Sequence, residues 1–182
     1  MKTQDTPLAE FIKAVAFAAE KHRHQRRKDA KASPYINHPI ALANVLCHEG
    51  GVEQITVLCA AILHDTIEDT ETTAAELEDV FGPWVAAVVL EVSDDKSLHK
   101  AARKQQQIDH APQLSDEAKL VKLADKICNL RDILASPPAG WSRERKREYF
   151  DWAKNVIDGL RGAHPQLEAI FDGLYARQSE LD

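Results

Sequence analysis

Apolar residues recur along the chain with the spacing of an α-helix rather than with the alternation of a β-strand. The pattern is clearest near the N-terminus, in Leu8, Phe11, Ile12, Val15, Ala16 and Ala19. Thr6 followed by Pro7 predicts an N-cap and the first position of that helix. Similar spacing predicts further helices from about Pro39 to Gly50-Gly51, Val52 to His64, Pro83 to Val92, Lys100 to Ala111, Asp116 to Leu134, Arg143 to Arg161 and Pro165 to Gln178.

Capping and turn residues separate these helices. Thr73-Ala74-Ala75-Glu76 has the sequence of a capping box, and Gly82 marks the end of the helix that it opens. The clearest loop covers residues 135–140, which contain two prolines and a glycine. We find no internal repeat, no interdomain linker and no convincing strand. The pattern therefore predicts an all-α fold, a single compact bundle of about eight to ten helices that forms one domain over residues 1–182.

Composition and charge narrow the function classes. Apolar residues make up 44% and charged residues 29% of the 182 residues, which is ordinary for a globular protein. No apolar run approaches the roughly 20 residues of a membrane helix, and no apolar signal core follows residues 1–5. We therefore expect a cytoplasmic protein without a membrane partner. The formal net charge of −6 argues against a general nucleic-acid binder, although a local basic cluster can still bind a small anion.

The cysteines offer no disulfide framework. Cys47, Cys59 and Cys128 are odd in number, form no C-x-x-C motif and each lie in an apolar helical context. We expect three reduced thiols that pack in the interior.

Candidate chemistry gathers where an apolar helix ends. His64 and Asp65 follow the apolar run Ile55 to Leu63, and at a helix terminus both side chains can turn toward one centre. Two further acids, Glu68 and Asp69, follow within one turn. These residues also have ordinary interpretations, because a histidine and an aspartate can interact with the end of a helix and the two acids can be plain loop residues.

Two more candidate donors lie elsewhere in the chain. His38 precedes Pro39 and can instead cap the helix that begins there. Asp125 lies with Lys122 and Asn129 on the polar face of a long helix, where it can also be simply solvated. Together the two histidines, Asp65 and Asp125 offer nitrogen and oxygen donors that suit manganese, iron or zinc. The lack of suitably placed thiols disfavours a structural zinc site.

The combined pattern resembles the HD superfamily of metal-dependent phosphohydrolases, and more closely the hydrolase domain of Rel/SpoT proteins. The matching segments are His22 to Asp29, Pro34 to Ile40, Ala60 to Thr70, Lys119 to Lys126 and Asn129 to Asp132. The resemblance covers about residues 11–178. Three segments resemble the stand-alone small alarmone hydrolases, including the metazoan SpoT homologues: the basic stretch within His22 to Asp29, Asp94-Asp95-Lys96 and Gly140-Trp141-Ser142. Because the chain ends at Asp182, we expect neither a synthetase domain nor regulatory domains.

The resemblance implies roles for individual residues. The positions that match the family's metal ligands are His38, His64, Asp65 and Asp125. The family usually carries Mn²⁺, with Zn²⁺ and Fe²⁺ as alternatives. Glu68 and Asp69 match the acidic pair held to activate and orient the attacking water. The positions expected to contact the nucleotide and its phosphates are Arg27, Lys28, Lys100, Asn129, Arg145 and Tyr149.

Several residues keep a structural alternative. The basic stretch can complement the dipole of the first helix, and Tyr149 is either part of the core or a stacking surface. For Trp152 in the same apolar stripe we expect a place in the core.

The leading hypothesis is a guanosine 3′,5′-bis(diphosphate) 3′-pyrophosphohydrolase that acts on a small nucleotide. Removal of the 2′-phosphate from NADPH is the alternative enzymatic function, and a non-catalytic alarmone-binding module is the alternative outside enzymes. A helical nucleic-acid binder is disfavoured by the negative charge. The oligomeric state and the physiological substrate do not follow from the sequence.

Overall fold

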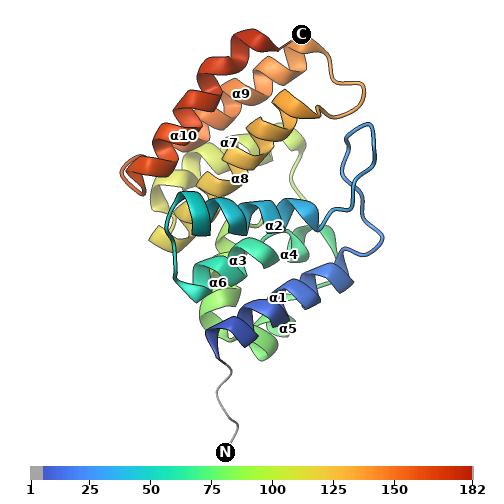
Figure 1. Cartoon of the computed structure of the whole chain (residues 1–182), viewed down its shortest axis with the longest axis vertical. Helices are drawn as coiled ribbons and strands as arrows, with labels where there is room; N and C mark the ends of the chain where they lie inside the picture. Colours follow the sequence, from blue (N-terminus) through green and yellow to red (C-terminus); the bar gives the residue numbers. More distant parts are fainter. Residues whose placement is uncertain (1–5, 182) are drawn as a thin grey trace, which may run out of the picture.

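The computed structural model describes residues 6–181 and is built from helices joined by short connections (Figure 1). The helices are α1 (Pro7–Lys21), α2 (Asn37–Asn44), α3 (Ile55–Leu63), α4 (Thr66–Asp69), α5 (Ala74–Phe81), α6 (Pro83–Val92), α7 (Lys100–His110), α8 (Asp116–Ala135), α9 (Arg143–Asp158) and α10 (Pro165–Ala176). Within the described residues there is no strand, only two isolated backbone bridges. The predicted all-α class is therefore confirmed. None of the described helices is long and apolar enough to cross a membrane.

Helices α3 and α8 form the centre of the fold. α3 packs against α1, α2, α6 and α8, and α8 in turn also contacts α2, α6, α9 and α10. Because neighbours surround it, α3 is apolar on nearly all sides, and six of its nine residues are buried. α1 and α5 lie at the end of the molecule near the N-terminus, whereas α9 and α10 lie at the end near the C-terminus (Figure 1).

The helix boundaries with strong local signals lie where the sequence predicts them. The Thr6 hydroxyl accepts a hydrogen bond from the Ala9 amide at 3.2 Å, and the Thr73 hydroxyl accepts one from the Glu76 amide at 3.1 Å. Gly82 has φ of +84° and joins α5 directly to α6. The capping box is only half formed, because the Glu76 carboxylate pairs with Lys21 at 2.7 Å.

Several helix boundaries differ from the prediction by two or three residues, since α3 begins at Ile55 rather than Val52 and α9 ends at Asp158 rather than Arg161. α2 begins at Asn37 rather than near Pro39, so His38 lies inside the first helical turn. The helix then widens into a π-helical turn over Val45–Glu49 and ends at Gly50, whose amide donates to the Val45 carbonyl at 2.9 Å. A Cβ at Gly50 would lie 2.8 Å from the Leu46 carbonyl oxygen, so no side chain fits there.

Two loops distant in sequence lie side by side. Residues 22–36, between α1 and α2, contact the loop that joins α8 to α9. Asp29 forms an isolated bridge with Pro138, and the Ala139 amide donates to the Lys28 carbonyl at 2.8 Å. The basic stretch therefore forms a loop on the flank of α8 rather than a simple cationic end of α1.

The cysteines are only partly as predicted. Cys59 and Cys128 are buried free thiols, but Cys47 is exposed. The prediction of a packed Cys47 is wrong because the π-helical turn presents this position to solvent.

Candidate active site

The end of α3 presents His64 and Asp65 toward the centre of the molecule. The His64 Nδ1–H donates to the Ala61 carbonyl at 2.8 Å, a bond assigned from the geometry around the ring. This contact leaves Nε2 free to face Asp65, whose Oδ2 lies 2.9 Å away. A ring held through one nitrogen by a backbone carbonyl is a common arrangement for a histidine that binds metal through the other.

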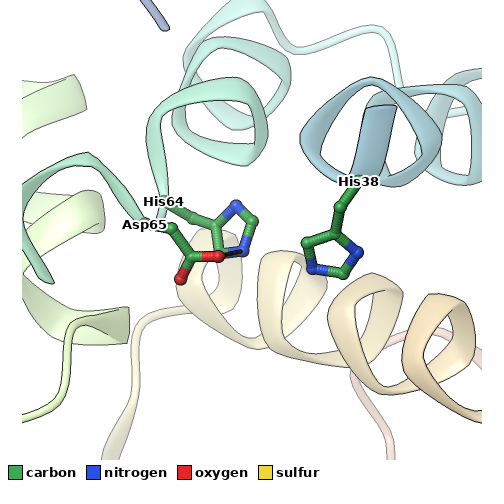
Figure 2. Close-up of side chains that lie close together, drawn as sticks. All are labelled: His38, His64 and Asp65. Carbon is green, nitrogen blue, oxygen red and sulfur yellow. Dashed lines mark ion pairs between the residues drawn. The ribbon is translucent and has the colours of Figure 1, made fainter. Parts of the chain in front are cut away.

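His38 reaches the same point from α2. Its ring centroid lies 5.4 Å from that of His64. Donor atoms of His38, His64 and Asp65 all lie within 4.8 Å of one another. Figure 2 shows the three side chains converging from two separate segments, and the dashed line marks the ion pair between His64 and Asp65.

Asp125 joins this group from α8, on the His38 side. Its Oδ1 lies 3.2 Å from His38 Nε2 and accepts a hydrogen bond from Asn129 Nδ2 at 2.7 Å. Its Oδ2 pairs with the Lys126 ammonium at 2.9 Å. Asp125 is not part of the mutually close set of three, but it shares one cavity of about 160 Å³ with them. The four predicted ligand positions therefore gather at one point.

The donor set fits a divalent cation. His38 Nδ1 is buried and has no hydrogen-bond partner, which is unusual for an imidazole nitrogen, and His64 Nε2 contacts only the carboxylate of Asp65. Burial opposes the charge on His64, yet Asp65 outweighs it and raises the pKa of His64 to about 9. The Asp65 carboxylate therefore favours positive charge at this point, which a bound cation can supply in place of a proton, and the nitrogen and oxygen donors suit a borderline or hard metal.

The two predicted acids of α4 lie in different surroundings. Burial, followed by the charges of Asp65 and Asp94, raises the pKa of Glu68 to about 6. Glu68 lines the 160 Å³ cavity, and its Oε2 accepts a hydrogen bond from the Asp94 amide at 3.2 Å. Asp69 is tied at both oxygens, by Gln25 Nε2 at 2.9 Å and by an ion pair with Lys96.

Two larger cavities adjoin the first. One, of about 500 Å³, shares Arg27, Tyr35, His38 and Asn129 with it. The other, of about 430 Å³, shares Glu68, Asp94 and Gln107. The two larger cavities meet at Lys28, Trp141 and Tyr149. Together the two larger cavities form one continuous space beside the cluster of histidines and carboxylates.

The predicted substrate contacts all line at least one of these cavities, but they divide between them. Asn129 faces the 500 Å³ cavity and Lys100 and Arg145 face the 430 Å³ cavity. Lys28 and Tyr149 lie at the junction. Arg27 is already paired with Asp132 at 2.6 Å, so its guanidinium is fixed in place.

Trp152 is half-buried and lines the 430 Å³ cavity, where its Nε1 donates to the Lys104 carbonyl at 3.0 Å. Its ring packs against the core and also forms part of the cavity wall.

Several residues at the site were not assigned from the sequence. They are Tyr35, which donates to Asp65, together with Arg103, Gln107, Lys122 and Lys126. Lys122 and Lys126 are separated by four residues and flank Asp125 on α8, so helical spacing offered a signal for both. Nothing in the local sequence distinguishes Arg103 or Gln107 from the other polar residues of α7.

Comparisons with known proteins give a consistent result. A family model described as HD domain matches residues 14–152. A relative from Danio rerio, named guanosine-3′,5′-bis(diphosphate) 3′-pyrophosphohydrolase MESH1, is 54% identical over 167 residues, covering 92% of this chain and 93% of the relative. The protein of the same name from Homo sapiens is 52% identical over 170 residues, covering 93% and 95%.

A solved structure agrees along the whole chain. It is described as "A metazoan ortholog of SpoT hydrolyzes ppGpp and plays a role in starvation responses". It superimposes with a TM-score of 0.91 at 46% identity and covers 99% of each chain.

Proposed function

Because the chain belongs to the HD domain family and is similar along its length to MESH1 hydrolases, we propose that it is a guanosine 3′,5′-bis(diphosphate) 3′-pyrophosphohydrolase. The observation that carries this proposal is one small cavity. It is lined by His38, His64, Asp65 and Asp125 together with the acid Glu68, and it adjoins a cavity lined by basic side chains. Metal donors, a proton acceptor and cations for an anionic substrate therefore lie next to one another.

The metal ligands in this proposal are His38, His64, Asp65 and Asp125, and the metal is Mn²⁺. When bound, such a cation lowers the pKa of a coordinated water and neutralises phosphoryl oxygens. Tyr35 fixes the Asp65 carboxylate, and Asn129 and Lys126 fix that of Asp125. These contacts orient the ligands before substrate arrives.

Glu68 accepts the proton of the attacking water. A pKa near 6 leaves it ionised at neutral pH, yet basic enough to take a proton in the transition state. The water oxygen forms a bond to the first phosphorus on the ribose 3′ oxygen, and the bond between that oxygen and phosphorus breaks. The 3′ oxygen takes up a proton, so one water and one substrate give GDP and intact pyrophosphate. Asp69, held by Gln25 and Lys96, orients the water.

The larger cavities receive the rest of the nucleotide. Lys28, Lys100 and Arg145 supply positive charge for the phosphates. Asn129 and Tyr149 contact the nucleoside. The fixed Arg27 guanidinium lines both the 500 Å³ cavity and the catalytic cavity. Stabilisation of negative charge by positioned cations contributes strongly to phosphoryl transfer.

Product identification tests the proposal. The purified protein is incubated with Mn²⁺ and a panel that holds the guanosine substrate, NADPH and deoxynucleoside triphosphates, and the products are followed by phosphorus NMR. We expect pyrophosphate and GDP from the guanosine substrate. Stepwise release of single phosphates, or hydrolysis of NADPH alone, would refute the assignment.

The proposal also covers the domain organisation and the cellular location. One hydrolase domain accounts for the whole chain, and the free thiols of Cys47, Cys59 and Cys128 are compatible with the reducing cytoplasm, where nucleotides are made and consumed.

A further inference from the structure

Lys122 is a buried lysine to which the proposed mechanism gives no role. It lies on α8 one turn before Asp125 and is only 9% exposed. Its side chain lines the 160 Å³ catalytic cavity together with Asp65 and Glu68. A lysine at this depth normally has a paired acid, because burial of an isolated charge is costly.

The Lys122 ammonium lacks such a partner. In residues 6–181 it forms no hydrogen bond and no ion pair. Lys126, one turn further along α8, is a useful comparison, because its ammonium pairs with Asp125 at 2.9 Å and lies 4.4 Å from the Trp152 ring centre. Burial, followed by the charge of Lys126, lowers the pKa of Lys122. Lys126 is therefore a paired structural cation, whereas Lys122 is unpaired.

A second side chain that lines this cavity, Gln107 of α7, is only partly satisfied. Gln107 Nε2 donates to both carboxylate oxygens of Asp94, at 2.7 and 2.8 Å, whereas Gln107 Oε1 is buried without a partner. Both Gln107 and Lys122 line the catalytic cavity. Gln107 Oε1 is an acceptor and requires a donor such as a hydroxyl group, whereas the Lys122 ammonium is a donor that faces the cavity without a protein acceptor and can therefore contact a ligand oxygen there.

The chemistry of that ligand follows from the charges. The Lys122 ammonium is a donor that favours an anion, and the carboxylates of Asp65 and Asp125 are already used by the donor set and by Lys126. We propose, on the basis of the proposed function, that Lys122 is a further catalytic residue whose ammonium contacts the oxygens of the phosphoryl group under attack. It stabilises the negative charge that builds up there as the bond to the ribose 3′ oxygen breaks.

The replacement Lys122→Met tests this proposal by removing the charge and keeping the length of the side chain. We expect kcat to fall by roughly 10²–10³-fold with little change in KM, since the contact acts mainly in the transition state. Manganese content and melting temperature should equal or exceed those of the wild type, because an unpaired buried charge has been removed. Lys119→Met, one turn earlier on α8 and outside these cavities, is the matched control and should leave kcat unchanged.

A binding measurement separates this role from the proposed function. Orthovanadate mimics a phosphoryl group under attack, and its affinity for the manganese-loaded protein is measured by isothermal titration without turnover. We expect Lys122→Met to bind it about tenfold more weakly, the scale of one charge-assisted hydrogen bond. A wild type that binds orthovanadate but does not cleave the guanosine substrate would refute the proposed function and leave this comparison intact. Unchanged kcat and orthovanadate affinity in Lys122→Met would overturn the role of Lys122, as would a parallel loss of manganese and melting temperature.

Discussion

Removing the Lys126 ammonium should destabilise the metal-free protein strongly. The Lys126 side chain is only 3% exposed, and its ammonium pairs with Asp125 Oδ2 at 2.9 Å. Burial opposes the charge, yet the Asp125 carboxylate holds the pKa of Lys126 above its usual range. In Lys126→Met, the Asp125 carboxylate remains buried without this cation.

The expected loss of stability follows from the burial of this ion pair. Breaking a buried ion pair by removing one partner costs about 3–5 kcal/mol. For a chain of this length, each kcal/mol lowers the melting temperature by about 2–4 °C, so we expect a fall of about 6–20 °C. Mn²⁺ should restore part of the loss, because a cation at the donor set neutralises the same carboxylate.

Calorimetric melts in a chelator and in excess Mn²⁺ measure both effects. The double replacement Lys126→Met with Asp125→Asn is the internal control, because removing both charges should cost less than the sum of the single changes. A metal-free Lys126→Met protein that melts at the wild-type temperature would refute the structural role of this ion pair.

Three further changes address the metal, the acid and the basic loop. His64→Ala should lose bound manganese and turnover together, as measured by elemental analysis and product formation. Glu68→Gln should keep the metal but lose about 10²–10⁴-fold in kcat, because the side chain keeps its size and loses its basicity. Lys28→Ala should lower kcat/KM and flatten its dependence on ionic strength, since the screening length is about 10 Å at 0.1 M salt.

Each of these variants has an exposed control nearby in the sequence: His48→Ala, Glu71→Gln and Lys31→Ala. Full manganese occupancy in His64→Ala would remove that residue from the metal site. A wild-type kcat in Glu68→Gln would make it an ordinary loop acid. Salt curves that run parallel for Lys28→Ala and the wild type would exclude a direct phosphate contact.

Much of the fold was predictable because its signals are local. Thr73 and Gly82 cap and end α5 through contacts with their own neighbours, so the printed sequence contains the whole explanation. The π-helical turn before Gly50 was not predictable in this way. A Cβ at Gly50 would also lie 3.1 Å from Leu167 of α10, so the turn is coupled to packing against a helix more than 100 residues away.

The site residues also divide into those that local sequence predicts and those that depend on tertiary packing. Histidine and aspartate at the end of an apolar helix are visible in the sequence, and His64 and Asp65 converge with His38 as expected. The state of the α8 lysines is not visible there. Burial of Lys126 depends on cover from Trp152, and only the assembled bundle separates a paired lysine from the unpaired Lys122.

The backbone contact between the two loops beside the cavities offers an internal reporter. The Ala139 amide donates to the Lys28 carbonyl, and Lys28 and Trp141 both belong to the wall where the larger cavities meet. Exchange of this single amide proton with solvent therefore records how often that wall opens, without a substrate, a label or a mutation. The opening rate of the wall becomes a measurable property of the resting protein, which can be set beside its turnover rate.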